Sequence, residues 1–272
     1  MRNLFGQTPE QRSIAIMREF KPPEGYYLAF SGGKDSIVLY ELAKRAGVKF
    51  TAHYSVTGID PPELVRFIRD EYPDVHWEKP PKMNWWKGLT KKGLPTRTAR
   101  WCCEVLKEHG GQGRIVLTGV RAAESNSRRR YSVVQPCRRR GHDKTYVHAL
   151  LHWQTGEVWD FIRGQDLPYC NLYDEGWARL GCVLCPFEMH PQRAMARWPR
   201  LFEATRRRVV ALYPQRPAWQ ARFPSGEAFW QWWLSRDQPY PQAQDEQETF
   251  AFDQFEDAEE VQDDRQPALQ GP

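Results

Sequence analysis

The chain has 272 residues, and 40% of them are hydrophobic, enough for the core of one α/β domain with an elaboration or of two small domains. No apolar run reaches the ~20 residues that a membrane-spanning helix needs. The first residues also lack the apolar stretch of a signal peptide. The sequence therefore predicts a soluble, cytoplasmic protein without a membrane partner, in which the six cysteines argue against disulfide bonds.

The net charge of +5 conceals an uneven distribution along the chain. Residues 241–272 hold ten acidic residues and one basic residue, a charge of −9, so the preceding residues carry +14. A body this basic usually meets an anion such as a nucleotide, a sulfate or a nucleic acid. A solubilising surface is the alternative interpretation, and charge alone does not separate the two.

Apolar runs and helical spacings alternate through the first half of the chain. Short apolar runs bounded by turn residues predict strands, and apolar residues three and four apart predict helices. These patterns predict strands at 26–30, 48–56 and 115–119 and helices at 13–20, 35–45 and 61–72. The expected fold class is therefore α/β, with a mostly parallel, twisted sheet and helices on both faces.

The second half of the chain is expected to be helical and irregular from residue 158 onward. The aromatic residues at 229–233 have helical spacing, which favours a core over a binding platform. The last residues are acidic and poor in aliphatic side chains, so we expect them to be disordered. The predicted units are a helical lead-in at 1–24, a nucleotide-binding domain at 25–165, a cysteine-containing helical extension at 166–240 and an acidic tail at 241–272.

A glycine-rich loop at residues 31–36, the phosphate loop, lies between a predicted strand and a predicted helix. Gly32 and Gly33 allow the backbone to approach a phosphate closely, and the free amides of the helix start favour an anion. Lys34 adds a cation, and Ser31 and Ser36 add hydroxyl donors. The loop is not a Walker A motif, because Leu28 stands where that motif needs glycine and Asp35 follows the lysine. A simple turn before a capped helix is the alternative.

The string Ser-Gly-Gly-Lys-Asp-Ser at 31–36 resembles the signature of the PP-loop ATP pyrophosphatases and of the related phosphoadenylyl-sulfate reductases. Further segments that resemble the reductase-like branch lie at 57–63, 118–125, 153–162, 167–169 and 172–173. The similarity spans residues 25–186. It implies a Rossmann-like PP-loop fold and an adenine nucleotide, ATP or adenylyl sulfate, as the substrate.

A second anion-binding segment is expected after the strand at 115–119. Gly119, Arg121 and Ser125 follow that strand, and Arg121 can grip a phosphate or sulfate with two parallel hydrogen bonds. The six arginines that follow between Arg128 and Arg140 exceed what one nucleotide needs. They could bind a nucleic-acid backbone or form a solvated surface loop, and the sequence favours neither interpretation.

Five cysteines form a candidate metal centre. Cys102 and Cys103 are adjacent, Cys182 and Cys185 form a Cys-x-x-Cys, and Cys170 precedes that pair. Thiols in two separate places favour a metal over a redox pair, and four sulfur ligands suit zinc or an iron–sulfur cluster. Buried, inert thiols are the alternative.

Resemblance narrows the choice of metal and ligands. The iron–sulfur branch of the adenylyl-sulfate reductases has a tandem Cys-Cys and a distant Cys-x-x-Cys, which implies a [4Fe-4S] cluster, with Zn²⁺ as the alternative. In related sulfur-transfer and DNA-phosphorothioation ATPases, three of the metal ligands look as if they come from the region that here contains Cys170, Cys182 and Cys185. Cys103, Cys182 and Cys185 belong to both schemes, and the fourth ligand is Cys102 or Cys170.

The expected reaction follows from one departure from the reductases, which need a thiol near the C-terminus. The last cysteine here is Cys185. The leading hypothesis is therefore an ATP pyrophosphatase that adenylates an acceptor and is coupled to iron–sulfur-assisted sulfur transfer from a sulfur donor. Lys34, Arg121 and Mg²⁺ would supply positive charge, and Asp35 would bind Mg²⁺ or cap the helix. A sulfonucleotide reductase that takes its thiol from a partner protein is the second hypothesis, and a nucleotide-gated nucleic-acid-binding module is the third.

Overall fold

The computed structural model describes residues 6–137 and 143–235. The acidic tail expected at 241–272 and Arg138, Arg139 and Arg140 lie outside the described residues.

The described residues build one six-stranded sheet with the order β3-β2-β1-β4-β6-β5. The strands are β1 (Tyr26–Phe30), β2 (Phe50–Ser55), β3 (His76–Glu78), β4 (Ile115–Thr118), β5 (Val134–Pro136) and β6 (Thr145–His148). Every neighbouring pair is parallel except β5 and β6 at one edge. The chain leaves β1 for β2 on one side and later returns to β4 on the other, so the sheet has its topological switch point between β1 and β4, where open α/β sheets bind ligands.

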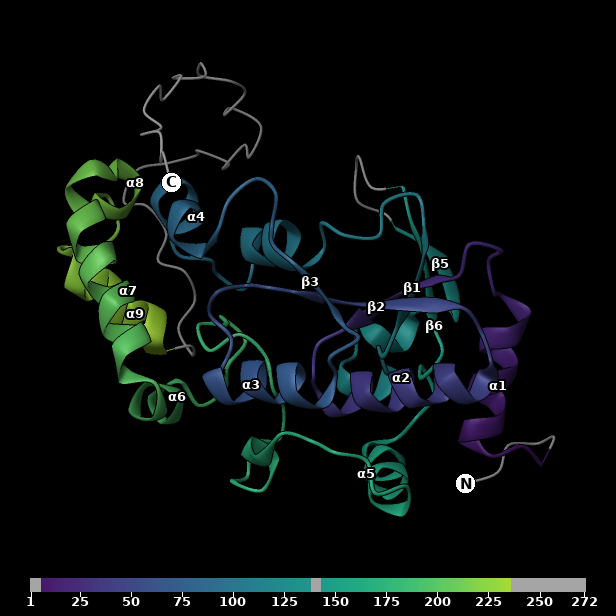
Figure 1. Ribbon diagram of the computed structural model, residues 1–272. Coiled ribbons are helices and arrows are strands. Elements are labelled where there is room, and N and C mark those ends of the chain that lie inside the picture. The colour runs from purple at the N-terminus through teal and green to yellow at the C-terminus, as the bar shows by residue number, and fades with distance from the viewer. Residues whose placement is uncertain (1–5, 138–142, 236–272) are drawn as a thin grey trace, which may run out of the picture.

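Helices cover both faces of this sheet, as the sequence predicts. One face carries α1 (Pro9–Glu19), α2 (Lys34–Ala46), α3 (Pro62–Glu71) and α5 (Thr155–Gly164), and the segment with α4 (Trp85–Lys92) lies on the other side (Figure 1). α2 packs against both α1 and α5. It ends where Gly47 adopts φ +65°, a left-handed conformation that favours glycine.

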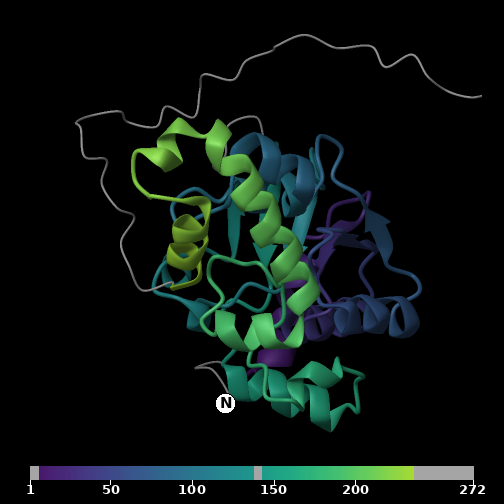
Figure 2. The ribbon, with the colours of Figure 1, turned by 90° about the vertical axis from the view of Figure 1, so that its left-hand side faces the viewer.

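The C-terminal helices form a separate layer beside α4. They are α6 (Pro191–Arg197), α7 (Pro199–Leu212), α8 (Pro217–Gln220) and α9 (Gly226–Ser235), and Figure 2 shows them in front of the sheet. The aromatic stripe lies on α9, where Phe229 and Trp230 are each 1% exposed. The Trp233 indole N–H donates to the Pro95 carbonyl at 2.8 Å and ties α9 to the segment after α4. The core interpretation of the stripe is therefore confirmed.

The sequence patterns do not predict three of the strands, β3, β5 and β6. Each is only three or four residues long, which is too short to show the alternation that predicts a strand. Among the described residues, no helix is both long and apolar enough to cross a membrane.

Candidate functional site

The phosphate loop connects β1 to α2 at the switch point of the sheet. Gly32 has φ +69°, and a Cβ there would lie 2.6 Å from Cγ1 of Ile68, so only glycine fits this turn. The Ser36 hydroxyl donates to the Gly33 carbonyl at 2.8 Å, and the Ser31 amide donates back to the Ser36 oxygen at 3.2 Å. These two bonds join the two ends of the loop.

Residues from the C-terminal part of the chain cover the start of α2. The Lys34 amide donates to the Tyr173 hydroxyl at 2.9 Å, and the Lys34 ammonium donates to the Ala178 carbonyl at 3.3 Å. Lys34 is only 6% exposed, and its Nζ lies 3.5 Å from Oδ2 of Asp35. Lys34 thus already has protein partners, and its role as a phosphate cation stays a prediction.

Arg121, which is buried, forms an ion pair with the partly exposed Asp35 across the switch point. The Arg121 Nε lies 2.6 Å from Oδ1 of Asp35, and the guanidinium also donates to Thr155 and to the Trp153 carbonyl. Arg121 is 3% exposed. An anion at Arg121 would have to share or replace these partners, so its predicted role as a phosphate ligand stays a prediction.

The other two residues of the second anion segment lie differently. Gly119 approaches α2 so closely that a Cβ would stand 3.0 Å from the carbonyl oxygen of Asp35. Ser125 is exposed, and its hydroxyl accepts the Arg128 amide at 3.2 Å. The structure therefore brings Gly119 and Arg121 to the phosphate-loop helix, whereas Ser125 faces solvent.

A cavity of about 300 Å³, the nucleotide cavity, opens over the carboxyl ends of β1 and β2. Its size is at the lower end of the range for small-molecule sites. The polar and sulfur-bearing side chains that line it are Tyr27, Ser31, His53, Tyr54, Ser55, Asp60, Lys107, Arg179, Cys182, Cys185 and Glu188. One cavity therefore joins the phosphate loop to the Cys-x-x-Cys.

A hydrogen-bonded network holds the cysteine side of this cavity. The Asp60 carboxylate accepts from the Tyr54 hydroxyl at 2.6 Å and from the Thr57 hydroxyl at 2.7 Å. The Cys182 sulfur is hydrogen-bonded to Thr57 and Lys107, and burial raises the pKa of its thiol to about 12. The network places the Lys107 ammonium beside the thiol, at the wall of the cavity.

Four of the five predicted metal ligands share one neighbourhood. Cys102 hydrogen-bonds to Cys103, and the charges of the nearby Cys182 and Cys185 raise the pKa of the Cys102 thiol. The hydrogen bond from Cys102, and next the charge of Lys107, lower the pKa of Cys103 to about 6. The tandem Cys-Cys and the Cys-x-x-Cys thus come together from distant parts of the sequence.

Cys170 lies apart from this group. It is 1% exposed, and its sulfur lies 3.8 Å from Oδ1 of Asn171. Burial raises the pKa of its thiol, and the negative charge of nearby carboxylates such as Glu63 raises this pKa further. Within the described part of the chain, no three His, Cys, Asp or Glu side chains lie close enough to hold a metal ion. The donor chemistry of the other four thiols fits a sulfur-ligated metal, but in the structure their sulfur atoms are not arranged around a common point.

Residues 25–188 match the model of the Phosphoadenosine phosphosulfate reductase domain. The chain belongs to this family. The resemblance drawn from the phosphate loop and the segments after it is therefore confirmed, and the match ends just after Cys185, so it includes the loop, the tandem cysteines and the Cys-x-x-Cys.

Three relatives illustrate the range of the family. An uncharacterized protein of Methanocaldococcus jannaschii is 29% identical over 212 residues, which cover 71% of this chain and 51% of that protein. Adenosine 5'-phosphosulfate reductase of Staphylococcus epidermidis is 29% identical over 151 residues, 50% of this chain and 59% of the reductase. A probable FAD synthase of Schizosaccharomyces pombe is 29% identical over 177 residues, 63% of this chain and 64% of the synthase. The chain thus spans between 51% and 64% of the length of these three relatives.

Several residues of this family member's site have no sequence signal of their own. Tyr27 donates to Oε2 of Glu78 at 2.7 Å and stacks on His53 with ring centroids 4.0 Å apart. Burial, and next the bond to Glu78, raise the pKa of Tyr27. Tyr27 has the appearance of a core strand residue, and only the fold shows that it also lines the cavity.

The arginine-rich segment is divided in the structure. Arg128 forms an ion pair with Glu124, while Arg129 and Arg130 are exposed beside it. The last three arginines lie outside the described residues. The nucleic-acid role predicted for this segment stays a prediction.

Proposed function

We propose that this chain binds ATP at the phosphate loop and cleaves it between the α- and β-phosphates, as an adenylating enzyme of sulfur chemistry. The observation that carries this proposal is the nucleotide cavity, which is lined both by Ser31 of the phosphate loop and by Cys182 and Cys185. A nucleotide in it would have its phosphates near the loop and would lie next to the thiols. The whole protein's activity is inferred from this local arrangement.

The residues of the cavity are suited to stabilise the departing pyrophosphate. Ser31 of the phosphate loop, Lys107 and Arg179 line the cavity, and Lys34 follows Ser31 in the same loop. Positioned positive charge is the main way in which proteins assist phosphoryl and nucleotidyl transfer. Mg²⁺ would bind mainly through the phosphates of the nucleotide, because Asp35 already pairs with Arg121.

The proposed reaction has two displacements. An oxygen of the acceptor attacks the α-phosphorus, the bond to the bridging oxygen breaks, and pyrophosphate leaves. A thiolate or sulfide from a sulfur donor then attacks the adenylated carbon of the acceptor and expels AMP. Both steps are substitutions and need no external oxidant or reductant.

Cys102, Cys103, Cys182 and Cys185 would hold the metal group that the family resemblance implies. We propose a [4Fe-4S] cluster there, with zinc as the alternative, since all four thiols lie in one neighbourhood. When bound, such a group would supply a place to hold or pass on sulfur beside the nucleotide. Cys170 is left out of the proposed ligand set, because the interactions of its sulfur are with other residues.

The test is a product assay on protein purified without oxygen. ATP should yield AMP and pyrophosphate, and Lys34→Ala should weaken ATP binding by about 10-fold to 150-fold, the value of one hydrogen bond to a charged group. Lys44→Ala is the matched control, because Lys44 is exposed on the same helix. ATP binding that is unchanged in Lys34→Ala would overturn the phosphate-loop assignment.

A second function deserves the same assay, because the cavity also presents Cys182 and Cys185 to a bound nucleotide. Adenylyl sulfate with a thiol-reductant protein would then yield sulfite and AMP while two thiols of the reductant are oxidised to a disulfide, as expected for a sulfonucleotide reductase. Sulfite without pyrophosphate favours this alternative over ATP cleavage. Nucleotide binding without either product favours a nucleotide-gated binding module.

A further inference from the structure

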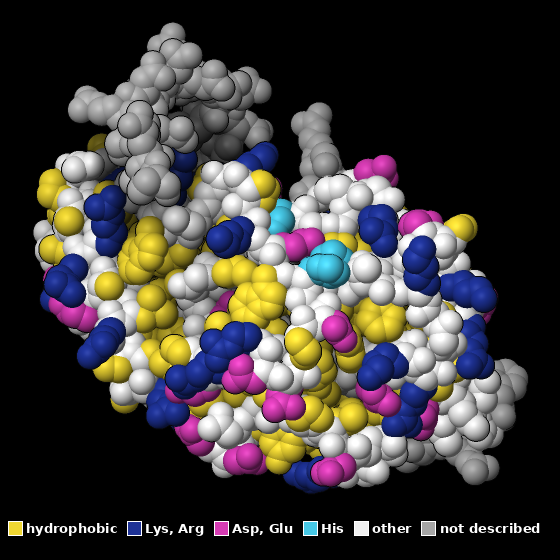
Figure 3. All heavy atoms as spheres, viewed as in Figure 1, with side chains coloured by type: hydrophobic (Ala, Val, Ile, Leu, Met, Phe, Trp, Pro, Cys, Tyr) yellow, Lys and Arg dark blue, Asp and Glu magenta, His cyan; other side chains and the backbone are white. Residues whose placement is uncertain are grey.

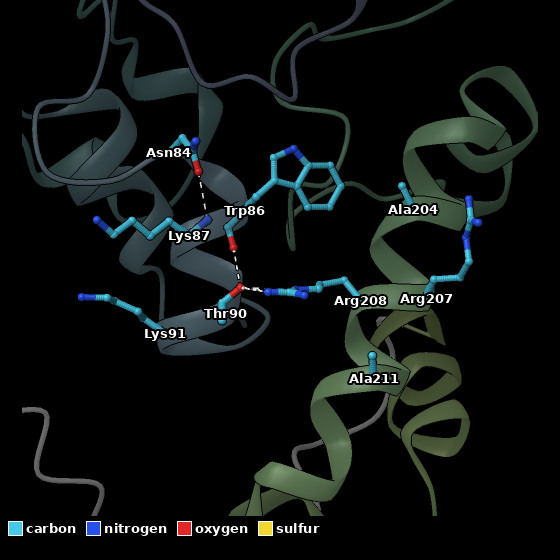
Figure 4. A pocket seen from close by; sticks show the side chains of 9 residues that line it. All are labelled: Asn84, Trp86, Lys87, Thr90, Lys91, Ala204, Arg207, Arg208 and Ala211. Atoms are coloured by element: carbon cyan, nitrogen blue, oxygen red, sulfur yellow. Dashed lines mark hydrogen bonds between the residues drawn. The ribbon is translucent and has the colours of Figure 1, made fainter. Parts of the chain in front are cut away.

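A wide groove, the α4–α7 groove, runs between helices α4 and α7, away from the nucleotide cavity. It encloses about 880 Å³ and is lined by Asn84, Trp86, Lys87, Thr90 and Lys91 from the α4 side and by Ala204, Arg207, Arg208 and Ala211 from α7. Figure 4 shows Trp86 pointing from α4 toward α7, while Lys87 and Lys91 point outward from the far side of α4. The groove therefore contains an exposed aromatic ring, and two cations lie beside it on the outer side of α4.

Specific hydrogen bonds set the spacing of the two helices. Arg208 reaches from α7 to the Thr90 hydroxyl, with its Nη2 2.8 Å and its Nε 3.3 Å from that oxygen. Arg216 donates to the carbonyl of the same threonine. Because these bonds hold α4 and α7 apart at a defined distance, the groove is a built feature of the fold (Figure 4).

The charge of the groove is uniformly positive. Lys87 and Lys91 are exposed, lie one helical turn apart, and form no ion pair with another described residue. Arg207 has one ion pair, 3.4 Å from Glu203, and that carboxylate also pairs with Arg206. None of the described residues that line the groove carries a carboxylate. Four cations on the two helices that form the groove indicate a ligand with several negative charges.

Trp86 indicates what else the ligand contains. Its indole is 39% exposed, whereas its neighbour Trp85 is 1% exposed and stacks on Trp101 in the core. Of the two adjacent tryptophans, Trp85 therefore packs in the core and Trp86 lies at the groove. On the face in Figure 3, hydrophobic side chains lie between Lys and Arg side chains over the side formed by α4 and α7. Such an interleaving of cations and aromatic rings suits unpaired bases joined by phosphates.

We propose that the α4–α7 groove binds a single-stranded segment of nucleic acid, with backbone phosphates at Lys87, Lys91, Arg207 and Arg208 and a base stacked on Trp86. A duplex hides the faces of its bases, and an inorganic polyphosphate has none, so neither would use the tryptophan. The acidic residues 241–272 of the chain are the competing occupant that charge alone would allow.

The test measures binding of a fluorescent oligothymidylate of about 15 nucleotides to the full chain by anisotropy over a salt series. Lys87→Gln/Lys91→Gln should weaken binding at low salt and reduce the slope of log Kd against log salt by about 1.4, the value of two single-strand phosphate contacts. Trp86→Ala should weaken binding about 5-fold to 150-fold without changing that slope, and Trp86→Phe should restore most of the loss.

The matched control is Lys21→Gln/Lys44→Gln, which removes the same charge from exposed positions after α1 and on α2, at the other end of the molecule (Figure 1). It should change Kd less than twofold. Pyrophosphate release without nucleic acid should be the same in all groove variants. A failure of the groove proposal can therefore be distinguished from a failure of the proposed reaction.

Three results would overturn the proposal. The first is equal binding by wild type and both groove variants. The second is a loss in Lys87→Gln/Lys91→Gln with none in Trp86→Ala, which indicates a surface for any polyanion. The third result combines two observations. The full chain binds no oligonucleotide at low salt, and a peptide of residues 241–272 binds to the protein but not to the groove variants. This result would assign the groove to the acidic tail.

Discussion

The backbone amide of Lys34 donates a hydrogen bond to the hydroxyl of Tyr173, with 2.9 Å between the two atoms. This amide belongs to the first turn of α2, whose free N–H groups would bind a phosphate. The Tyr173 ring also lies under the Lys34 ammonium, 5.7 Å from its Nζ. A nucleotide phosphate at this amide must therefore displace the tyrosine hydroxyl.

Tyr173→Phe should raise the affinity for ATP by about twofold to tenfold, because no bond to the hydroxyl has to be exchanged for the phosphate. Calorimetric titration measures the change. Tyr169→Phe is the control, since its hydroxyl bonds to Asp174 instead. Weaker ATP binding in Tyr173→Phe would mean that the hydroxyl itself contacts the nucleotide.

Arg121→Met should lower the free energy of unfolding by about 2 kcal/mol, because it removes the charge-assisted hydrogen bond from the buried guanidinium to Asp35 and leaves Lys34 as the ionic partner of that carboxylate. Arg121→Met/Asp35→Asn should recover part of that loss, and urea unfolding compares the two. Arg45→Met removes two ion pairs, to Glu10 and Glu41, from a side chain that is 31% exposed, and should cost about 1 kcal/mol or less. Equal losses at Arg121 and Arg45 would contradict the structural role of the pair between Arg121 and Asp35.

The cysteine variants separate the two possible ligand sets. In protein purified without oxygen, Cys102→Ser and Cys185→Ser should lose bound iron, because these thiols belong to the group of four. Cys170→Ser should retain it, because Cys170 packs against other residues. Iron analysis with the absorption spectrum measures both outcomes. Loss of iron in Cys170→Ser with retention in Cys102→Ser would select the other ligand set.

The stability of the protein should fall as the pH falls below about 6.5, in part because of His148. Burial, and next the charge of Arg128, lower the pKa of His148 to about 4. Between the two values the unfolded chain binds a proton that the folded chain does not, so acid favours unfolding by up to roughly 3 kcal/mol. The side chain is 2% exposed and bonds to the Thr118 hydroxyl at 2.6 Å.

His148→Gln should therefore flatten part of the dependence of unfolding free energy on pH between 7.5 and 5. His190→Gln, at an exposed position, is the matched control and should leave the curve as it is. An unchanged curve in His148→Gln would show that other groups cause the acid sensitivity, for example His53 and His109, whose pKa values burial also lowers.

The sequence by itself determined the strand, turn and helix around the phosphate loop. The apolar run at β1, the glycines after it and the spacing of α2 act within a few residues of one another, so local backbone preferences decide them. β1 begins and ends where the run predicts, and α2 begins one residue before its predicted start. The same local patterns carry the family resemblance.

Only the tertiary structure decided which distant groups meet. No spacing in the chain pairs Arg121 with Asp35, places Tyr173 on the Lys34 amide, or separates Cys170 from the four other thiols. The α4–α7 groove likewise depends on a bond between Arg208 and Thr90. These contacts join segments that the packing of the sheet and the C-terminal helices brings together, and the free energy that selects them is a property of the whole core rather than of any one segment.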